Sequence, residues 1–152
     1  MRKLSELALK IAATQLHVRE KTNNNDGPDV EKYLKSIGLG PGYAWCQAFV
    51  YWCYQQAAAE LKIKNPVPKT GGVLKHWGDT TAKKDGLPDR GDLFVMAFNG
   101  GLGHIGFVEK VEGDWIHTLE GNTNDDGSRE GIGVFRRKRR IKDINRGFIE
   151  YL

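Results

Sequence analysis

The chain has 152 residues, a length typical of a single domain. Hydrophobic residues make up 39% of the chain and charged residues 28%, an ordinary globular composition that argues against disorder. No stretch approaches the ~18 consecutive apolar residues that a membrane span requires. The net charge of +4 is concentrated after Val134, where the basic residues are Arg136, Arg137, Lys138, Arg139, Arg140, Lys142 and Arg146. Such a segment is suited to nucleic acid, to another anionic polymer or to solvent alone.

The first part of the chain predicts helices. Apolar residues recur at helical spacing over residues 1–15, and a second short helix is expected between Pro28 and Gly38. Residues 45–59 are long and apolar almost all round, which favours a buried central helix. Residues 66–88 mix Gly, Lys, Asp and Thr, so we expect a loop-rich region there with one short helical turn.

The last third of the chain predicts strands. More than half of the 19 glycines follow Pro88, and they separate runs of β-branched and aromatic residues. The expected strands are Asp92–Phe98, Gly103–Val111, Trp115–Glu120, Gly131–Arg139 and Arg146–Tyr151. Helices followed by antiparallel strands give an α+β fold, with the N-terminal helices packed on the C-terminal sheet. We find no internal repeat or linker, so residues 1–152 are expected to form one domain, in which residues 1–26 supply the first helix and a loop.

Several kinds of active site lack their motifs in this sequence. None of the serines lies in a Gly-x-Ser-x-Gly turn; they are Ser5, Ser36 and Ser128. The four histidines show no metal-ligand spacing; they are His17, His76, His104 and His117. The Asn-rich loop that ends at Gly27 would need a carboxylate where Tyr33 stands if it were a calcium loop. We therefore expect no metal and no organic cofactor.

The two cysteines have different predicted surroundings. Cys46 and Cys53 are seven residues apart, which on one helix separates them by ~10.5 Å along the axis, beyond the reach of a disulfide. Cys46 stands at the start of the predicted central helix, where unpaired N–H groups and the helix dipole lower the pKa of a thiol. The alternative is that Cys46 is only a small buried hydrophobe. Cys53 fits that alternative, because it shares the packed helix face with Phe49.

His104 and Glu120 lie on two strands that a hairpin would bring together. If residues 112–114 form a three-residue turn, His104 lies opposite Asn122, and Glu120 is its diagonal neighbour on the same face. Diagonal neighbours are ~7–8 Å apart, within side-chain reach. A two-residue turn would shift the register by one and send Glu120 and Asn122 to the far face. Taken alone, His104 reads as a satisfied histidine and Glu120 as an exposed carboxylate at the end of a strand.

Four motifs in this order give the chain a family resemblance: PGYAWCQAFV at 41–50, PDRGD at 88–92, GHIGFV at 103–108 and EGNTN at 120–124. From about residue 27 to the end, the sequence resembles the CHAP family of cysteine, histidine-dependent amidohydrolases and peptidases. The resemblance implies a papain-like fold and cleavage of amide bonds in peptidoglycan. It also implies that Cys46 is the nucleophile, His104 the general base and acid, and Glu120 the group that orients the imidazole. Asn122 matches a position that helps to orient or stabilise the oxyanion.

The leading hypothesis is therefore a peptidoglycan hydrolase, either a muramoyl-alanine amidase or a murein endopeptidase, that works through a Cys-His-Glu thiol mechanism. One alternative keeps the fold but makes the chain a non-catalytic binding or structural module of a phage particle. Another is a nucleic-acid-binding protein that uses the basic run 136–140, although such a run is more often a solvated edge. In the many phage enzymes of the family that have a polar residue before the cysteine, that residue stands where Trp45 stands here.

The partners and the location follow from the same hypothesis. We expect a monomer that binds peptidoglycan, with the basic C-terminal segment as a contact for other anionic wall polymers, and no membrane partner. Glu6 and Lys10 interrupt the apolar run that a secretory signal needs. We therefore expect synthesis in the cytoplasm and action at the bacterial cell wall, reached by phage lysis or by a specialised export route.

Overall fold

The computed structural model describes residues 2–123 and 131–152. In these ranges the helices are α1 (Lys3–Ala13), α2 (Pro28–Ser36), α3 (Cys46–Leu61) and α4 (Val73–Asp79). The three helices predicted before residue 62 are confirmed. Among the helices of the described ranges, none is long and apolar enough to cross a membrane.

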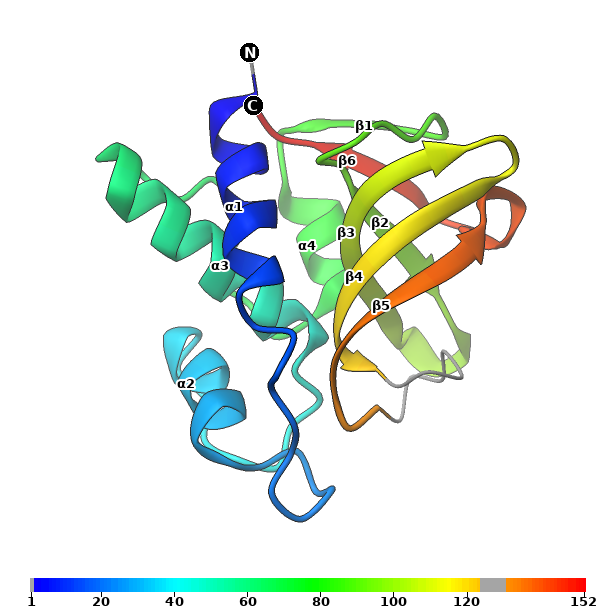
Figure 1. Ribbon diagram of the computed structural model, residues 1–152. Coiled ribbons are helices and arrows are strands. Elements are labelled where there is room, and N and C mark those ends of the chain that lie inside the picture. The colour runs from blue at the N-terminus through cyan, green and yellow to red at the C-terminus, as the bar shows by residue number, and fades with distance from the viewer. Residues whose placement is uncertain (1, 124–130) are drawn as a thin grey trace.

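The strands form one antiparallel sheet with the order β1-β6-β2-β3-β4-β5. Their bounds are β1 (Lys83–Asp85), β2 (Leu93–Ala97), β3 (Gly103–Glu112), β4 (Trp115–Thr123), β5 (Gly133–Arg140) and β6 (Gly147–Glu150). The sheet is strongly curved, and the helices gather on one side of it (Figure 1). The predicted α+β, papain-like arrangement of N-terminal helices on a C-terminal antiparallel sheet is confirmed.

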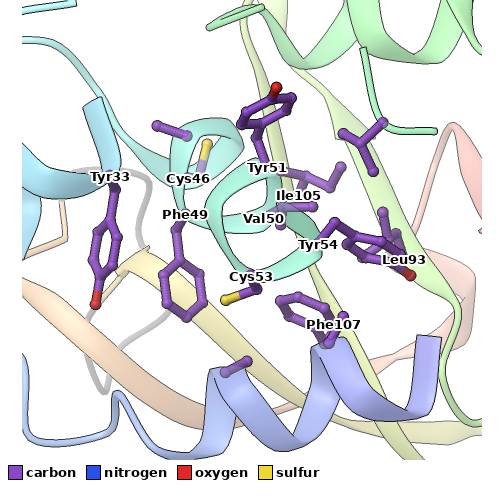
Figure 2. Close-up of a cluster of buried hydrophobic side chains, with 14 of the residues drawn as sticks. Tyr33, Cys46, Phe49, Val50, Tyr51, Cys53, Tyr54, Leu93, Ile105 and Phe107 are labelled. Atoms are coloured by element: carbon purple, nitrogen blue, oxygen red, sulfur yellow. The ribbon is translucent and has the colours of Figure 1, made fainter. Parts of the chain in front are cut away.

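Helix α3 is the centre of the core because it is apolar on almost every side. Phe49 packs edge-on against Phe107 of β3, with ring centroids 6.2 Å apart, and Tyr54 stacks on the same Phe107 ring at 6.1 Å. Tyr33 of α2 meets Phe49 from another side at 5.1 Å. Figure 2 shows these rings around α3, with Cys46 and Cys53 pointing to different sides of the helix. The first turn of α3 is therefore fixed against both the other helices and the sheet.

The β3–β4 hairpin differs from the predicted one in its turn. Glu112 pairs with Trp115, so the turn has two residues and not three, and the prediction of a three-residue turn is wrong. A β-bulge at Glu109 then shifts the register back by one residue, so that Val108 pairs with Thr118. The bulge cancels the shift that the short turn introduces. Glu120 consequently stays on the face that the longer turn would have given it.

The region 66–88 has more structure than its composition predicts. Helix α4 covers two turns where one was expected, and its Val73 and His76 are buried. Strand β1 was not predicted; it pairs with β6 at the edge of the sheet, Lys83 opposite Glu150. Its three residues, Lys83–Asp85, are charged and mostly exposed, so they show no alternation of apolar and polar residues. Short charged strands are common at sheet edges because they discourage further pairing.

Candidate active site

Cys46 is the first residue of α3, and only 3% of it is exposed. The residue before it, Trp45, provides no side-chain cap for the helix and is fully buried. The indole Nε1 of Trp45 donates a hydrogen bond of 2.8 Å to Glu20, and its ring stacks on Tyr33 at 5.7 Å. The uncapped N–H groups of the first turn thus remain next to the Cys46 thiol, while Trp45 holds the helix start in place.

Glu20 ties this helix start to the sheet, a role that the sequence alone does not reveal. One carboxylate oxygen accepts from Trp45, the other accepts from the backbone N–H of Asn25 at 3.0 Å, and the residue is only 7% exposed. Its own backbone N–H donates to the carbonyl of Ile132 at 2.8 Å. A glutamate in a polar loop carries no pattern that distinguishes it, so its partner in the core could not be predicted.

His104 is the second residue of β3, and its imidazole is buried between Cys46 and Glu120. Its Nε2 lies 2.7 Å from Oε1 of Glu120, and Cys46 is near enough to act on its pKa. Burial by itself would lower the pKa of His104, but the interactions with Cys46 and Glu120 outweigh burial and raise the pKa to about 9. The structure therefore brings together the three residues that the resemblance names as nucleophile, base and orienting group.

The Glu120 carboxylate is fully buried and accepts four hydrogen bonds. Oε1 accepts from His104 Nε2 and from Arg139 Nη2, both at 2.7 Å. Oε2 accepts from Arg139 Nε at 2.7 Å and from the Thr118 hydroxyl at 2.5 Å. Burial favours the protonated acid, but the bonds and charges of Arg139 and His104 hold the pKa of Glu120 far below its ordinary range. Glu120 is thus an ionised acceptor, and not the exposed strand-end carboxylate of the alternative reading.

Asn122 follows Glu120 where β4 is irregular. The register of β4 against β5 changes between Glu120 and Thr123, and Asn122 is buried with a φ of 56°. This bulge, more than strand alternation, sets the direction of the Asn122 side chain. At Gly121, a Cβ atom would lie 2.7 Å from Cγ of Phe49, so this glycine lets β4 approach α3 closely. Asn124, the last residue of the fourth motif, lies outside the described residues.

The remaining cysteine and one of the remaining histidines lie apart from this group. Cys53 is buried, and burial raises the pKa of its thiol well above the ordinary value. In Figure 2 its sulfur points between Phe49 and Phe107, away from Cys46. His117 is on the opposite face of β4 from Glu120, as strand alternation predicts, and its Nε2 lies 3.0 Å from Glu112 at the surface.

His76 belongs to a second buried polar network, which reaches α3 one residue after Cys46. Its Nδ1 lies 3.0 Å from Oε1 of Gln47, and its Nε2 lies 2.8 Å from the hydroxyl of Tyr151. The Tyr151 hydroxyl also meets Oγ1 of Thr80 at 2.6 Å. Burial lowers the pKa of His76 to about 4, so the ring is neutral at neutral pH. Nδ1–H then donates to Gln47, while Nε2 accepts from Tyr151.

The basic run on β5 is split between the two faces of the sheet. Arg136 pairs with Glu109 at 2.8 Å, and Lys138 and Arg140 lie over the ring of Trp115 at 4.8 and 4.4 Å. Arg139 points the other way, and its side chain is only 12% exposed because it is bound to Glu120. The interpretation of the run as a solvated edge is wrong for Arg139, since alternate residues of a strand face opposite sides.

Within residues 2–123 and 131–152, no group of three His, Cys, Asp or Glu side chains is arranged to bind a metal ion. The loop before α2 uses its carboxylate internally: Asp26 accepts hydrogen bonds from the Thr22 backbone N–H at 2.8 Å and from the Thr22 hydroxyl. The bonds from Thr22 lower the pKa of Asp26. The loop therefore serves as a turn in this structure.

Comparison with known families decides the assignment. The CHAP domain family matches residues 38–122, more than half of the chain. The chain belongs to the CHAP domain family. The match begins before Cys46 and includes His104, Glu120 and Asn122, so the buried group described above lies within the CHAP region.

Solved structures with the same fold include the crystal structure of Ly7917 and that of Ly7917 with the hydrolyzing product of MDP. Each has a TM-score of 0.56 to this CHAP domain and is 15% identical to it in sequence. The alignments cover 97% of this chain but 62% of Ly7917, so the chain spans less than two thirds of that protein. A comparison with curated protein sequences gives no match.

Proposed function

We propose that this CHAP domain hydrolyses an amide bond of peptidoglycan through a thiol mechanism that uses Cys46, His104 and Glu120. The observation that carries the proposal is the buried chain of contacts from the Cys46 thiol through the His104 ring to the ionised Glu120. The family assignment supports hydrolysis of peptidoglycan, and the crystal structure of Ly7917 with the hydrolyzing product of MDP supports a hydrolytic reaction for this fold.

The hydrogen bonds fix which nitrogen of His104 does which work. An ionised Glu120 can only accept a hydrogen bond, so Nε2 of His104 carries a proton and donates a hydrogen bond to Oε1. Nδ1 is then the ring nitrogen that serves Cys46. Because the pKa of His104 is raised to about 9, the ring holds a second proton at neutral pH, and a charged imidazole favours the thiolate form of a neighbouring cysteine. The resting site is an imidazolium beside a thiolate.

In the reaction, the Cys46 thiolate attacks the carbonyl carbon of the amide and forms a tetrahedral oxyanion. Nδ1–H of His104 gives its proton to the leaving nitrogen, the C–N bond breaks, and a thioester remains on Cys46. The neutral imidazole then takes a proton from water as that water attacks the thioester. Collapse of the second tetrahedral intermediate releases the carboxylic acid and restores the thiolate and imidazolium.

The oxyanion requires hydrogen-bond donors that are already in place. The first turn of α3 provides backbone N–H groups that no side chain caps, next to the attacking sulfur. The Asn122 amide is the side-chain candidate, as the family resemblance implies. Its left-handed backbone conformation at the β4 bulge fixes where that amide can point.

Affinity for the anionic cell wall has a separate source in this proposal. Lys138 and Arg140 are exposed on β5 and flank Trp115, on the face away from Glu120. Their charges favour anionic wall polymers, with an affinity that falls as salt screens them. The same arrangement gives no reason to expect sequence-specific reading of nucleic acid. The cell wall is accordingly the proposed site of action.

The test is digestion of purified peptidoglycan, followed by mass spectrometry of the new ends. The wild type should release fragments, and Cys46→Ser and His104→Ala should release none. Glu120→Gln should retain the fold but lose most activity, because glutamine can still accept a hydrogen bond but has no charge to stabilise the imidazolium. Stem peptides cut from intact lactyl groups would identify a muramoyl-alanine amidase, and cuts within the peptides a murein endopeptidase. Wild-type protein that releases nothing would overturn the proposal in favour of a non-catalytic module.

A further inference from the structure

Arg139 of the edge strand β5 forms a two-point ion pair with Glu120 of β4. The guanidinium binds both carboxylate oxygens, through Nε and Nη2, at 2.7 Å each. The Arg139 side chain is 12% exposed and the Glu120 side chain is fully buried. The guanidinium also lies over the ring of Phe94, 5.4 Å from its centroid. Exposed ion pairs contribute little to stability. A bidentate arginine–carboxylate pair that is shielded from water, by contrast, fixes both the charge and the orientation of the carboxylate.

The hydrogen bonds of Glu120 show what Arg139 adds. A carboxylate has about four acceptor positions, and His104, Thr118 and the two donors of Arg139 fill them. The carboxylate therefore cannot rotate away from the imidazole. Removing Arg139 would leave a fully buried carboxylate with one charged neighbour, the His104 ring, and burial would then favour the protonated acid.

A protonated Glu120 could not do the work that the proposed mechanism requires. It would have no charge to stabilise the His104 imidazolium, and its own proton would compete for the position that Nε2–H occupies. The charged and titratable groups that act on Glu120 are His104 from β3 and Arg139 from β5, and Cys46 from α3 acts on it through His104. Arg139 is the one permanent charge among them.

We infer that Arg139 is a positioning residue of this site: it keeps Glu120 ionised and oriented toward His104. The inference rests on the proposed function, since it assigns Arg139 a part in the same reaction. Arg139 acts through Glu120 and touches no reacting atom. The basic run of β5 thus supplies one residue to the site from its inner face, while its outer face remains available to solvent or polymer.

The direct test is a pH titration of the Glu120 carboxyl. It is monitored by ¹³C NMR, with ¹³C label in the glutamate side chains and with no substrate present. Glu120→Gln identifies the resonance by its loss. In the wild type, the resonance should not titrate between pH 4 and 8. In Arg139→Met, the midpoint should rise into this range, because the loss of an adjacent arginine raises a carboxyl pKa and burial of Glu120 raises it further. Arg139→Lys keeps the charge without the fork, so its midpoint should lie between the two.

Arg140→Met is the matched control, because it makes the same chemical change on the next residue, over Trp115 and away from Glu120. Its Glu120 resonance should behave as in the wild type. In assays of kcat/KM on peptidoglycan, the acidic limb of the pH profile should move upward in Arg139→Met relative to the wild type. An unchanged Glu120 midpoint in both Arg139 variants, or an equal shift in Arg140→Met, would overturn the inference. Absence of hydrolysis by the wild type would overturn the proposed function and leave the carboxyl titration as a separate result.

Discussion

The buried His76 predicts that the protein loses stability in mild acid. In the native structure this ring is fully buried and hydrogen-bonded between Gln47 and Tyr151. Protonation would place a charge there and would also put a proton on Nε2, which accepts from Tyr151 in the neutral form. The unfolded chain has no such restriction. We therefore expect the native state to resist protonation of His76 and the unfolded state to accept it.

The size of the effect follows from the two pKa values. Burial lowers the pKa of His76 from 6.5 to about 4. Between these values the unfolded chain binds more protons than the native one, so stability is complete above pH 6.5 and is lost as the pH falls toward 4. At ~1.4 kcal/mol per pH unit, the loss is about 3 kcal/mol. That is a large part of the roughly 5–15 kcal/mol by which a domain is stable.

The assay is urea unfolding of the wild type and of His76→Gln at pH 7 and at pH 4, monitored by tryptophan fluorescence. Glutamine has no charge at either pH, so the wild type should lose about 3 kcal/mol more than this variant on acidification. Tyr151→Phe is the control: it disturbs the same network but retains the histidine, and it should keep the pH dependence. An equal loss in the wild type and in His76→Gln would refute the argument, whatever their stabilities at pH 7.

Three further predictions concern the site and its support. Iodoacetamide at neutral pH should modify Cys46 well before Cys53, because only Cys46 has an imidazole beside it and burial raises the Cys53 pKa; mass spectrometry of the peptides would show the order. His117→Ala should keep most hydrolytic activity while His104→Ala keeps none, and the reverse result would contradict the base assignment. Gly106→Ala should destabilise the protein by about 1–3 kcal/mol in urea unfolding and lower activity. Its Cβ would lie 2.5 Å from Cε2 of Phe94 and 2.8 Å from Cγ of Glu120.

The sequence predicts best those helices and strands whose own residues show a pattern typical of that element. The central helix is apolar on almost every side, which implies burial, and Cys46 stands where this apolar run begins. The strands that carry His104 and Glu120 are bounded by glycines and rich in β-branched residues. By contrast, β1 has neither signal, because its stability comes from pairing with β6 at a sheet edge.

The contacts that sequence could not supply are those that depend on register. The bulge at Glu109 has no marker in the sequence, yet it decides which face of β4 carries Glu120. Arg139 is one of five consecutive basic residues, and only the register of β5 against β4 shows which of them points inward. Glu20 lies 25 residues before Trp45, and no local pattern joins the two.

The opposed turn and bulge of the β3–β4 hairpin have a consequence for insertions and deletions in relatives of this chain. A relative can keep the separation of 16 residues between histidine and glutamate in two ways: with a two-residue turn and a bulge, as here, or with a three-residue turn and no bulge. Adding a residue at the turn lengthens this separation by one residue, and deleting Glu109 shortens it by one, but both leave Val108 opposite Thr118, so the glutamate keeps its face. Aligned by structure, CHAP domains should therefore accept a length change at either place alone, and their histidine and glutamate should keep facing positions although the number of residues between them changes by one.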